Sequence, residues 1–221
     1  METLSLLQAP LTDNFCLERS LYNHGYNFVA GTDEVGRGPL AGPVVAAAVI
    51  LPQDFDHSIF IDSKVLSHKK RMHLLQILYD IDAQIGIGVV SEKKIDEINI
   101  LQASLLAMKK SIQALSRKYQ KPSFLLVDGK FNVPMRLPQA ALIKGESKSA
   151  SIAAASIVAK EHRDALMNKL DRKYPQYGFA QHSGYPTKKH RDTIATIGPC
   201  PHHRKSFKGV KEYVDVSQKA G

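Results

Sequence analysis

The sequence predicts an α/β protein in which a mixed β-sheet is flanked by helices. Short apolar runs rich in valine, isoleucine and alanine recur between turn residues, which is typical of strands. Longer segments place apolar residues at every third or fourth position, which is typical of amphipathic helices. The first strands follow one another closely whereas the later ones alternate with helices. This order favours a sheet with both antiparallel and parallel neighbours.

The strands can be assigned in chain order. A short amphipathic segment near 15–22 precedes them, and a turn rich in glycine and proline separates the first two. The predicted strands are 28–33, 43–51, 85–90, 124–128 and 140–144.

The helices follow from the apolar period. Ser67 is the expected N-cap of the first. The predicted helices are 67–82, 91–119, 149–173 and 188–197. Phe207, Val210 and Tyr213 also have helical spacing within a basic segment. The chain therefore divides into an N-terminal lead-in (1–27), a main domain (28–198) and a basic helical tail packed on that domain (199–221).

Length and charge narrow the function classes. The chain has 221 residues, of which 43% are hydrophobic and 23% charged, as in ordinary globular proteins. The net charge is +9, and residues 144–221 hold 15 basic and 7 acidic side chains against 15 and 14 in residues 1–143. A solvated surface would explain this excess, but clustered lysine and arginine also bind polyanions by releasing phosphate counterions.

Cellular context can be inferred from what the sequence lacks. Cys16 and Cys200 give neither a metal-binding spacing nor a disulfide framework. The first residues do not read as a signal peptide, and the most apolar run, 43–51, is too short to cross a membrane. We therefore expect a cytoplasmic protein that does not associate with membranes and is monomeric.

Acidic residues recur where the predicted strands end. Asp33 and Glu34 lie at the end of the first strand, Asp128 ends a later one, and Glu146 follows the last. A single such acid is commonly a loop cap, but acids at the ends of neighbouring strands converge on one edge of an open sheet. Three or four carboxylates can hold two Mg²⁺ or Mn²⁺ ions for phosphodiester hydrolysis. Oxygen ligands without a Cys/His cluster favour these ions over zinc.

A glycine-arginine-glycine turn, Gly36-Arg37-Gly38, follows the first acidic pair. It fits a loose dinucleotide-binding pattern, but the segment after it reads as a strand where that motif needs a helix. We interpret it as a turn that brings backbone N–H groups close to nucleic acid. The triplet 162–164 (His-Arg-Asp) lies in the middle of a predicted helix, and we expect it on the surface.

These motifs together closely resemble bacterial ribonuclease HII, a family of type 2 ribonucleases H. The resemblance runs in order from about residue 28 to residue 213 without large gaps. The segments that match are 31–42, 62–67, 126–129, 144–146, 151–160, 177–187 and 202–207.

The resemblance implies a ribonuclease H-like fold with a sheet of about five strands. It implies cleavage of the RNA strand of RNA–DNA hybrids, and incision on the 5′ side of single ribonucleotides in duplex DNA, with Mg²⁺ or Mn²⁺. Carried over by position, the catalytic metal ligands are Asp33, Glu34, Asp128 and Glu146. The turn Gly36, Arg37 and Gly38 would detect the 2′-hydroxyl that distinguishes RNA from DNA. Tyr185 would stack on the neighbouring sugar, and Ser63 and Lys64 would contact phosphates.

One position departs from the family. Ribonuclease HII usually has aspartate where this chain has Glu146, and the longer arm puts the preference between Mg²⁺ and Mn²⁺ in question. Asp164 is an alternative fourth carboxylate, although its place within a helix argues against it. The sister family ribonuclease HIII commonly has glutamate here. That family usually adds an N-terminal domain, for which about 27 residues are too few.

Two further classes of protein compete with a junction-type ribonuclease H. A non-catalytic binding module could use the basic C-terminal third, but it would gain nothing from gathering acids near phosphates. A different metallonuclease on the same fold, such as a resolvase or integrase, would act on DNA alone. Such an enzyme has no need of a group that detects the 2′-hydroxyl, so the turn and Tyr185 argue against it.

Overall fold

The computed structural model describes residues 13–214, and its centre is a mixed five-stranded sheet with the strand order β3-β2-β1-β4-β5. The central strand β1 runs antiparallel to β2 and parallel to β4. The outer pairs are β2 with β3, antiparallel, and β4 with β5, parallel. The predicted mixed α/β architecture is thereby confirmed. The strands are β1 (Val29–Val35), β2 (Val44–Ile50), β3 (Gln84–Val90), β4 (Phe124–Asp128) and β5 (Gln139–Leu142).

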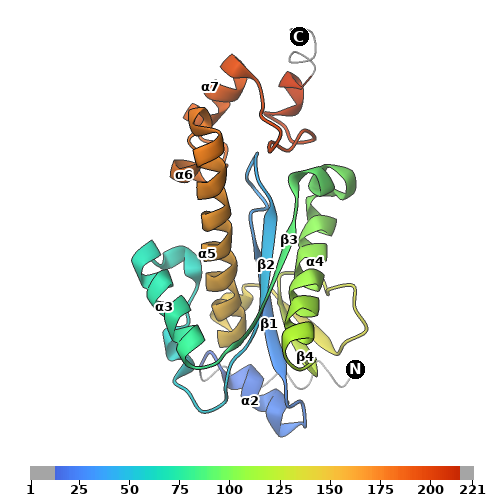
Figure 1. Cartoon of the computed structure of the whole chain (residues 1–221). Coiled ribbons are helices and arrows are strands. Elements are labelled where there is room, and N and C mark those ends of the chain that lie inside the picture. The colour runs from blue at the N-terminus through green and yellow to red at the C-terminus, as the bar shows by residue number, and fades with distance from the viewer. Residues whose placement is uncertain (1–12, 215–221) are drawn as a thin grey trace.

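Helices cover both faces of this sheet. Figure 1 shows α3 and α5 on one side of the strands and α4 on the other. The α-helices are α2 (Cys16–Asn23), α3 (His68–Asp80), α4 (Glu92–Lys118), α5 (Ala150–Lys173), α6 (Phe179–His182) and α7 (Lys188–Ile197). Short 3-10 helices are η1 (His57–Ile59), η2 (Ser63–Val65), η3 (Gly145–Ser147), η4 (Pro175–Tyr177) and η5 (Lys211–Tyr213). The expected N-cap is confirmed, because the Ser67 hydroxyl accepts a hydrogen bond from the Lys70 amide.

The first turns of α5 lie directly against β1. Small residues at the start of α5 are buried, and Gly31 of β1 faces them. A Cβ added at Gly31 would lie 2.2 Å from the backbone carbon of Ser151, so a side chain there would displace the helix. This close contact fixes α5 beside the strand that bears Asp33 and Glu34.

Two segments differ from the sequence-based expectation. Residues 202–210 form turns rather than a helix, and only the short η5 follows them. Gly198, Pro199, Pro201 and Gly209 interrupt this segment, and proline and glycine disfavour continuous helix. The long helix α4 is also kinked at Asn99, whose φ is 66°. Within the described part of the chain, no helix combines the length and apolar character needed to cross a membrane.

Candidate active site

The sheet brings the predicted acids to the carboxyl ends of three adjacent strands. Asp33 and Glu34 lie near the end of β1, and Asp128 is the last residue of the parallel neighbour β4. Glu146 lies in η3, which follows β5 directly beside β4. We call Asp33, Glu34, Asp128 and Glu146 the strand-end acids.

Asp33 lies at the centre of this group. Its side chain is almost fully buried, with 6% of the residue exposed. Burial raises the pKa of Asp33 well above its ordinary value, and the charges of Glu34, Asp128 and Glu146 raise it further. Its carboxylate accepts a hydrogen bond of 2.7 Å from the Glu34 amide, which opposes these effects. The four acids therefore lie close enough to repel one another.

The carboxyl group of Glu146 lies close enough to Asp128 to affect the pKa of Asp128. Burial raises the pKa of Asp128 to about 6, and the Glu146 contact and the charges of Glu146 and Glu34 act in the same direction. The amide of Gly145 donates a 2.7 Å hydrogen bond to Asp128, which favours the ionised form. The neighbouring acidic charges therefore disfavour the ionised form of Asp128, and a cation bound beside it would favour that form.

The donor set fits a divalent ion of the magnesium type. All four ligands are carboxylates, which are the donors that Mg²⁺ and Mn²⁺ prefer. Their repulsion, seen in the raised pKa values of Asp33 and Asp128, is what a bound cation would relieve. In residues 13–214, no three His, Cys, Asp or Glu side chains are already arranged to hold a metal ion.

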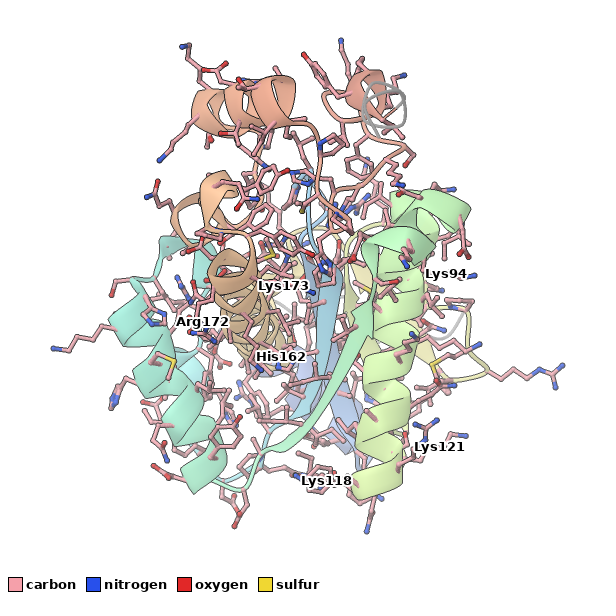
Figure 2. The ribbon with its side chains drawn as sticks, turned by 45° about the horizontal axis from the view of Figure 1, so that its top comes forward. Lys94, Lys118, Lys121, His162, Arg172 and Lys173 are labelled. Atoms are coloured by element: carbon pink, nitrogen blue, oxygen red, sulfur yellow. The ribbon has the colours of Figure 1, made fainter. Side chains whose placement is uncertain are left out.

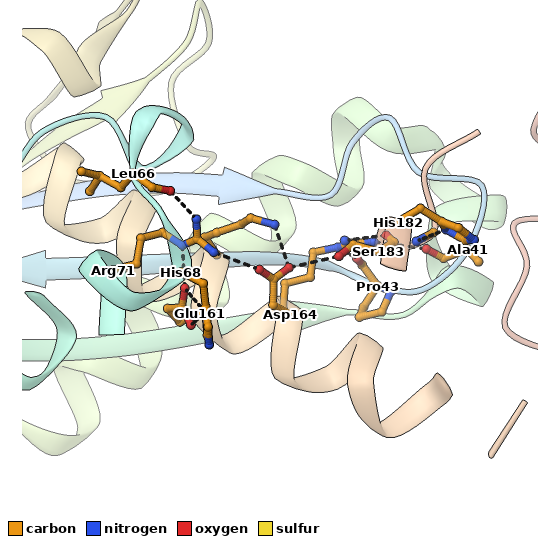
Figure 3. Close-up of polar contacts among 12 residues, drawn as sticks. Ala41, Pro43, Leu66, His68, Arg71, Glu161, Asp164, His182 and Ser183 are labelled. Atoms are coloured by element: carbon orange, nitrogen blue, oxygen red, sulfur yellow. Dashed lines mark hydrogen bonds and ion pairs between the residues drawn. The ribbon is translucent and has the colours of Figure 1, made fainter. Parts of the chain in front are cut away.

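Asp164 is not part of this group. Its carboxylate accepts hydrogen bonds from Lys160 at 2.7 Å and from Arg71 at 3.4 Å, and these cations compensate its charge. Figure 3 shows these contacts as part of a polar chain that continues through Ser183 to Ala41 and Pro43. Of the two candidates for a fourth acid, the structure places Glu146 with Asp33 and Asp128.

The expectation that the triplet 162–164 lies on the surface is wrong for Arg163. This residue is fully buried, because α5 turns it toward the loop between β1 and β2. Its guanidinium donates to the carbonyl oxygens of Pro43 at 3.0 Å, Ala41 at 3.2 Å and Ser183 at 2.9 Å. Helical spacing could not reveal this role, since the partners lie up to 122 positions away.

A second buried arginine holds the β1–β2 loop (residues 36–43), which contains the glycine-arginine-glycine turn. Arg204 is fully buried and donates to the carbonyl oxygens of Gly36 at 2.5 Å, Arg37 at 3.0 Å and Gly42 at 2.9 Å. Burial lowers the pKa of Arg204 to about 9, so it stays charged at neutral pH. Gly36 has a φ of 100°, which favours glycine.

The same loop is flanked by both an acid and the predicted stacking tyrosine. Arg37 is exposed and reaches back to Glu34 at 3.3 Å. Gly38 lies beside the Tyr185 ring, since a Cβ there would be 3.5 Å from a ring carbon. Tyr185 is 43% exposed, so its ring is open to solvent. The structure thus brings Tyr185, Gly36, Arg37 and Gly38 together next to Glu34.

Ser63 and Lys64 lie in η2, just before α3, and not in the β1–β2 loop. Ser63 is buried. The carbonyl oxygen of Leu66, just after this turn, accepts a 2.8 Å hydrogen bond from Arg71. A phosphate-binding role for Ser63 and Lys64 stays a prediction.

Exposed basic side chains are not confined to the last third of the chain. Figure 2 shows Lys94, Lys118 and Lys121 on and after α4, and Arg172 and Lys173 at the end of α5. Lys94 is paired with Glu97 at 2.7 Å, and Lys173 lies over the Tyr174 ring at 5.4 Å. A polyanion could be contacted from both sides of the sheet.

The fold and the strand-end acids define a class of metal-dependent nucleases in which carboxylates converge on one sheet edge. The model of the family Ribonuclease HII matches residues 30–210. Ribonuclease HII of Desulfotalea psychrophila is 68% identical, over 100% of this chain and 98% of the relative, and that of Geobacter metallireducens is 49% identical, over 94% and 99%. The crystal structure of ribonuclease H2 from Pyrococcus horikoshii is similar, with a TM-score of 0.68, 27% identity, and coverage of 87% of this chain and 99% of the other.

The chain therefore belongs to the ribonuclease HII family. It is a hydrolase of the ribonuclease H type, an endonuclease that acts on the RNA strand of RNA–DNA hybrids. Dependence on a divalent metal ion is typical of this family, and the donor set agrees with it.

Proposed function

We propose that this ribonuclease also incises duplex DNA on the 5′ side of a single embedded ribonucleotide and leaves a 3′-hydroxyl. One observation supports this most directly. The turn at Gly36–Gly38 lies between an acid of the site and an exposed aromatic ring, with Arg37 3.3 Å from Glu34 and Gly38 beside Tyr185. Contact with one ribose would therefore be coupled directly to the acids that carry out cleavage.

The strand-end acids would hold two Mg²⁺ or Mn²⁺ ions. When bound, such ions activate a water molecule and stabilise the leaving oxygen of the phosphodiester. Asp33 supplies the buried, central carboxylate, and Asp128 is fixed by the Gly145 amide at 2.7 Å. Glu34 and Glu146 complete the set from either side of these two residues, so the negative charge is concentrated at one sheet edge.

The β1–β2 loop would read the sugar rather than the base. Only the 2′-hydroxyl distinguishes RNA from DNA at one nucleotide, and backbone groups can contact it without reading sequence. Arg204 donates to Gly36 and Arg37 and so holds the loop in one conformation. Tyr185 would stack on the sugar of the following deoxynucleotide. The Ser63–Lys64 turn would contact a phosphate farther along the strand.

The substrates we propose are RNA–DNA hybrids and ribonucleotide-containing duplex DNA. The catalytic unit spans 28–198, with the described part of the C-terminal segment, 199–214, packed on it, and it acts as a monomer in the cytoplasm. Residues 1–12 of the predicted lead-in and 215–221 of the predicted tail lie outside the described residues. The main-chain hydrogen bond from Arg204 to the Leu40 carbonyl, 2.8 Å, supports this packing, because it ties the C-terminal segment to the β1–β2 loop.

The test compares three duplexes in Mg²⁺ and in Mn²⁺: an RNA–DNA hybrid, DNA with one ribonucleotide, and all-DNA. We expect incision 5′ to the ribonucleotide and no cleavage of all-DNA. Tyr185→Ala should lower kcat/KM on the single-ribonucleotide duplex by about 10- to 100-fold, the usual worth of one stacking contact, and affect the hybrid less. Equal losses on both substrates would remove Tyr185 from junction reading. Cleavage of all-DNA would favour a DNA-specific nuclease.

A further inference from the structure

A buried row of histidines connects the C-terminal segment to Tyr185. His190 and His203 are both essentially inaccessible to solvent, with 0% and 1% exposed. Their Nε2 atoms face each other at 3.0 Å. At one end, the Cys200 amide contacts His203 Nδ1 at 3.0 Å, and at the other, His190 Nδ1 contacts the Tyr185 carbonyl oxygen at 2.9 Å.

These contacts fix the proton on each ring. A backbone N–H can only donate, so His203 Nδ1 accepts and the proton of His203 is on Nε2. That proton is donated to His190 Nε2, which leaves the proton of His190 on Nδ1, facing the Tyr185 carbonyl oxygen. Every hydrogen bond therefore points in one direction, from Cys200 to Tyr185.

The one-directional hydrogen bonds require that His190 and His203 are both neutral. Burial lowers the pKa of His203 to about 3 and that of His190 to about 4. A second proton on either ring would place two N–H groups against each other across the 3.0 Å contact. The neighbouring rings of His182, Tyr177 and Phe179 pack around the pair, 4.4 to 5.7 Å away, and exclude water.

The backbone of Tyr185 is held on both sides. Its amide donates to the His182 carbonyl oxygen at 2.8 Å, and its own carbonyl accepts from both Thr187, at 2.8 Å, and His190. The preceding residue, Gly184, accepts from the Leu40 amide at 2.8 Å. The ring of Tyr185 is exposed while its main chain is fixed, so the row sets where the ring lies relative to Gly38.

We propose that His190 and His203 are positioning residues that hold Tyr185 in place for recognition of the RNA–DNA junction. This inference rests on the role proposed above for Tyr185. The two histidines are buried, and they act through the hydrogen bond from His190 to the Tyr185 carbonyl oxygen. His203 lies in the segment 202–207 that matches the family, but two histidines 13 positions apart have no motif spacing that would reveal the pair.

Two substitutions of His190 separate positioning from packing. In His190→Asn, the side-chain amide nitrogen takes the place of Nδ1 and can still donate to Tyr185, whereas His190→Leu removes the donor. We expect His190→Leu to lower kcat/KM on the single-ribonucleotide duplex by about tenfold, while the hybrid changes by less than about twofold. His190→Asn should restore most of this loss. His73→Leu, an exposed histidine on α3, is the matched control and should change neither substrate.

A double variant tests whether His190 acts through Tyr185. In a Tyr185→Ala background, His190→Leu should cause no further loss on the single-ribonucleotide duplex. An additional tenfold loss would overturn the proposal. The proposal would also be overturned if Tyr185→Ala lowered the preference for the single-ribonucleotide duplex over the hybrid while His190→Leu kept the wild-type preference. If Tyr185→Ala itself has no selective effect, the proposed role of Tyr185 fails instead.

Nitrogen NMR of the unmodified protein tests the row without any variant. We expect neutral rings at pH 7, with the proton of His190 on Nδ1 and that of His203 on Nε2. These positions should persist in Tyr185→Ala, since the backbone carbonyl remains. Any other pair of tautomers, or a charged ring at pH 7, would overturn the proposed arrangement even if His190→Leu failed to fold.

Discussion

The segment from Asp33 to Pro43 contacts charged groups of opposite sign along its length: acidic side chains at its start, and two buried arginines along the loop. At its start, burial and the charges of the neighbouring acids raise the pKa values of Asp33 and Asp128. Along the loop that follows, Arg163 and Arg204 are fully buried, and each donates to several backbone carbonyls. The acids have one exposed cation beside them, Arg37 at 3.3 Å from Glu34, whereas each buried arginine has several hydrogen-bond acceptors. The charge of the acids is thus only partly compensated where we propose that a metal ion binds, whereas the arginines are hydrogen-bonded where the backbone must stay fixed.

The acid side of this comparison is tested most severely by Asp128→Asn. Loss of one carboxylate from the metal site should lower kcat on the hybrid by at least about a hundredfold, because a bound divalent ion supplies several kcal/mol of transition-state stabilisation. Hybrid binding, measured in Ca²⁺ to prevent turnover, should change little. Asp54→Asn, an exposed aspartate, is the control. Retained turnover would remove Asp128 from the metal site.

The same variant should have the opposite effect on stability. The pKa of Asp128 is raised to about 6, so its ionised form destabilises the metal-free fold above that pH. At pH values above about 6, Asp128→Asn should therefore raise the thermal unfolding midpoint of the metal-free protein. The gain should vanish below about pH 4, where Asp128 is protonated in both folded and unfolded wild type. A lowered midpoint at pH 7 would mean that the acid is satisfied within the protein.

Replacing a buried arginine should lower the stability of the fold, whereas replacing Asp128 should raise it. Arg204→Met keeps most of the side-chain volume but leaves the carbonyls of Gly36, Arg37 and Gly42 without a donor. We expect a loss of about 2–4 kcal/mol in unfolding free energy, measured in urea, because buried carbonyls without partners cost about 1–3 kcal/mol each and part of the loop can relax.

Two controls define this result. Arg172→Met changes an exposed arginine and should stay within about 0.5 kcal/mol of wild type. Arg204→Lys should recover little, since an ammonium group cannot reproduce the planar fork that reaches three carbonyls. If Arg204→Met were as stable as wild type, the loop would not depend on this residue.

The two regions also differ in how far the sequence predicts them. Asp33, Glu34 and Asp128 could be placed together because each ends an apolar run, and strand ends meet at one edge of a sheet. Glu146 joins them because β5 runs parallel to β4, and no helix between these two strands marks that direction in the sequence. The acid side is therefore largely a consequence of local pattern.

The arginines and histidines have no such pattern. Arg163 reads as a surface residue in the middle of a helix, and Arg204 as one basic residue among many in a basic tail. Their partners are backbone carbonyls 120 and 168 positions away, and a carbonyl leaves no mark in the sequence. The one signal for Arg204 was that it lies within a segment shared with the family. Backbone satisfaction of this kind became visible only when the fold brought the two segments together.

Glu146→Asp tests the finest part of the comparison, the fit between the strand-end acids and the ion they hold. Shortening the arm by one methylene withdraws the carboxyl group from Asp128, whose pKa the Glu146 contact raises. Mg²⁺ demands near-ideal octahedral geometry. We therefore expect the ratio of Mg²⁺-supported to Mn²⁺-supported cleavage to rise by about three- to tenfold, with the Mn²⁺ rate nearly constant. Titration of the apparent metal affinity at pH 6 and pH 8 provides a second readout, because an Asp128 that ionises more readily should make Mg²⁺ binding less dependent on pH. An unchanged metal ratio and an unchanged pH dependence would together show that the longer arm of Glu146 has no bearing on which ion the site accepts.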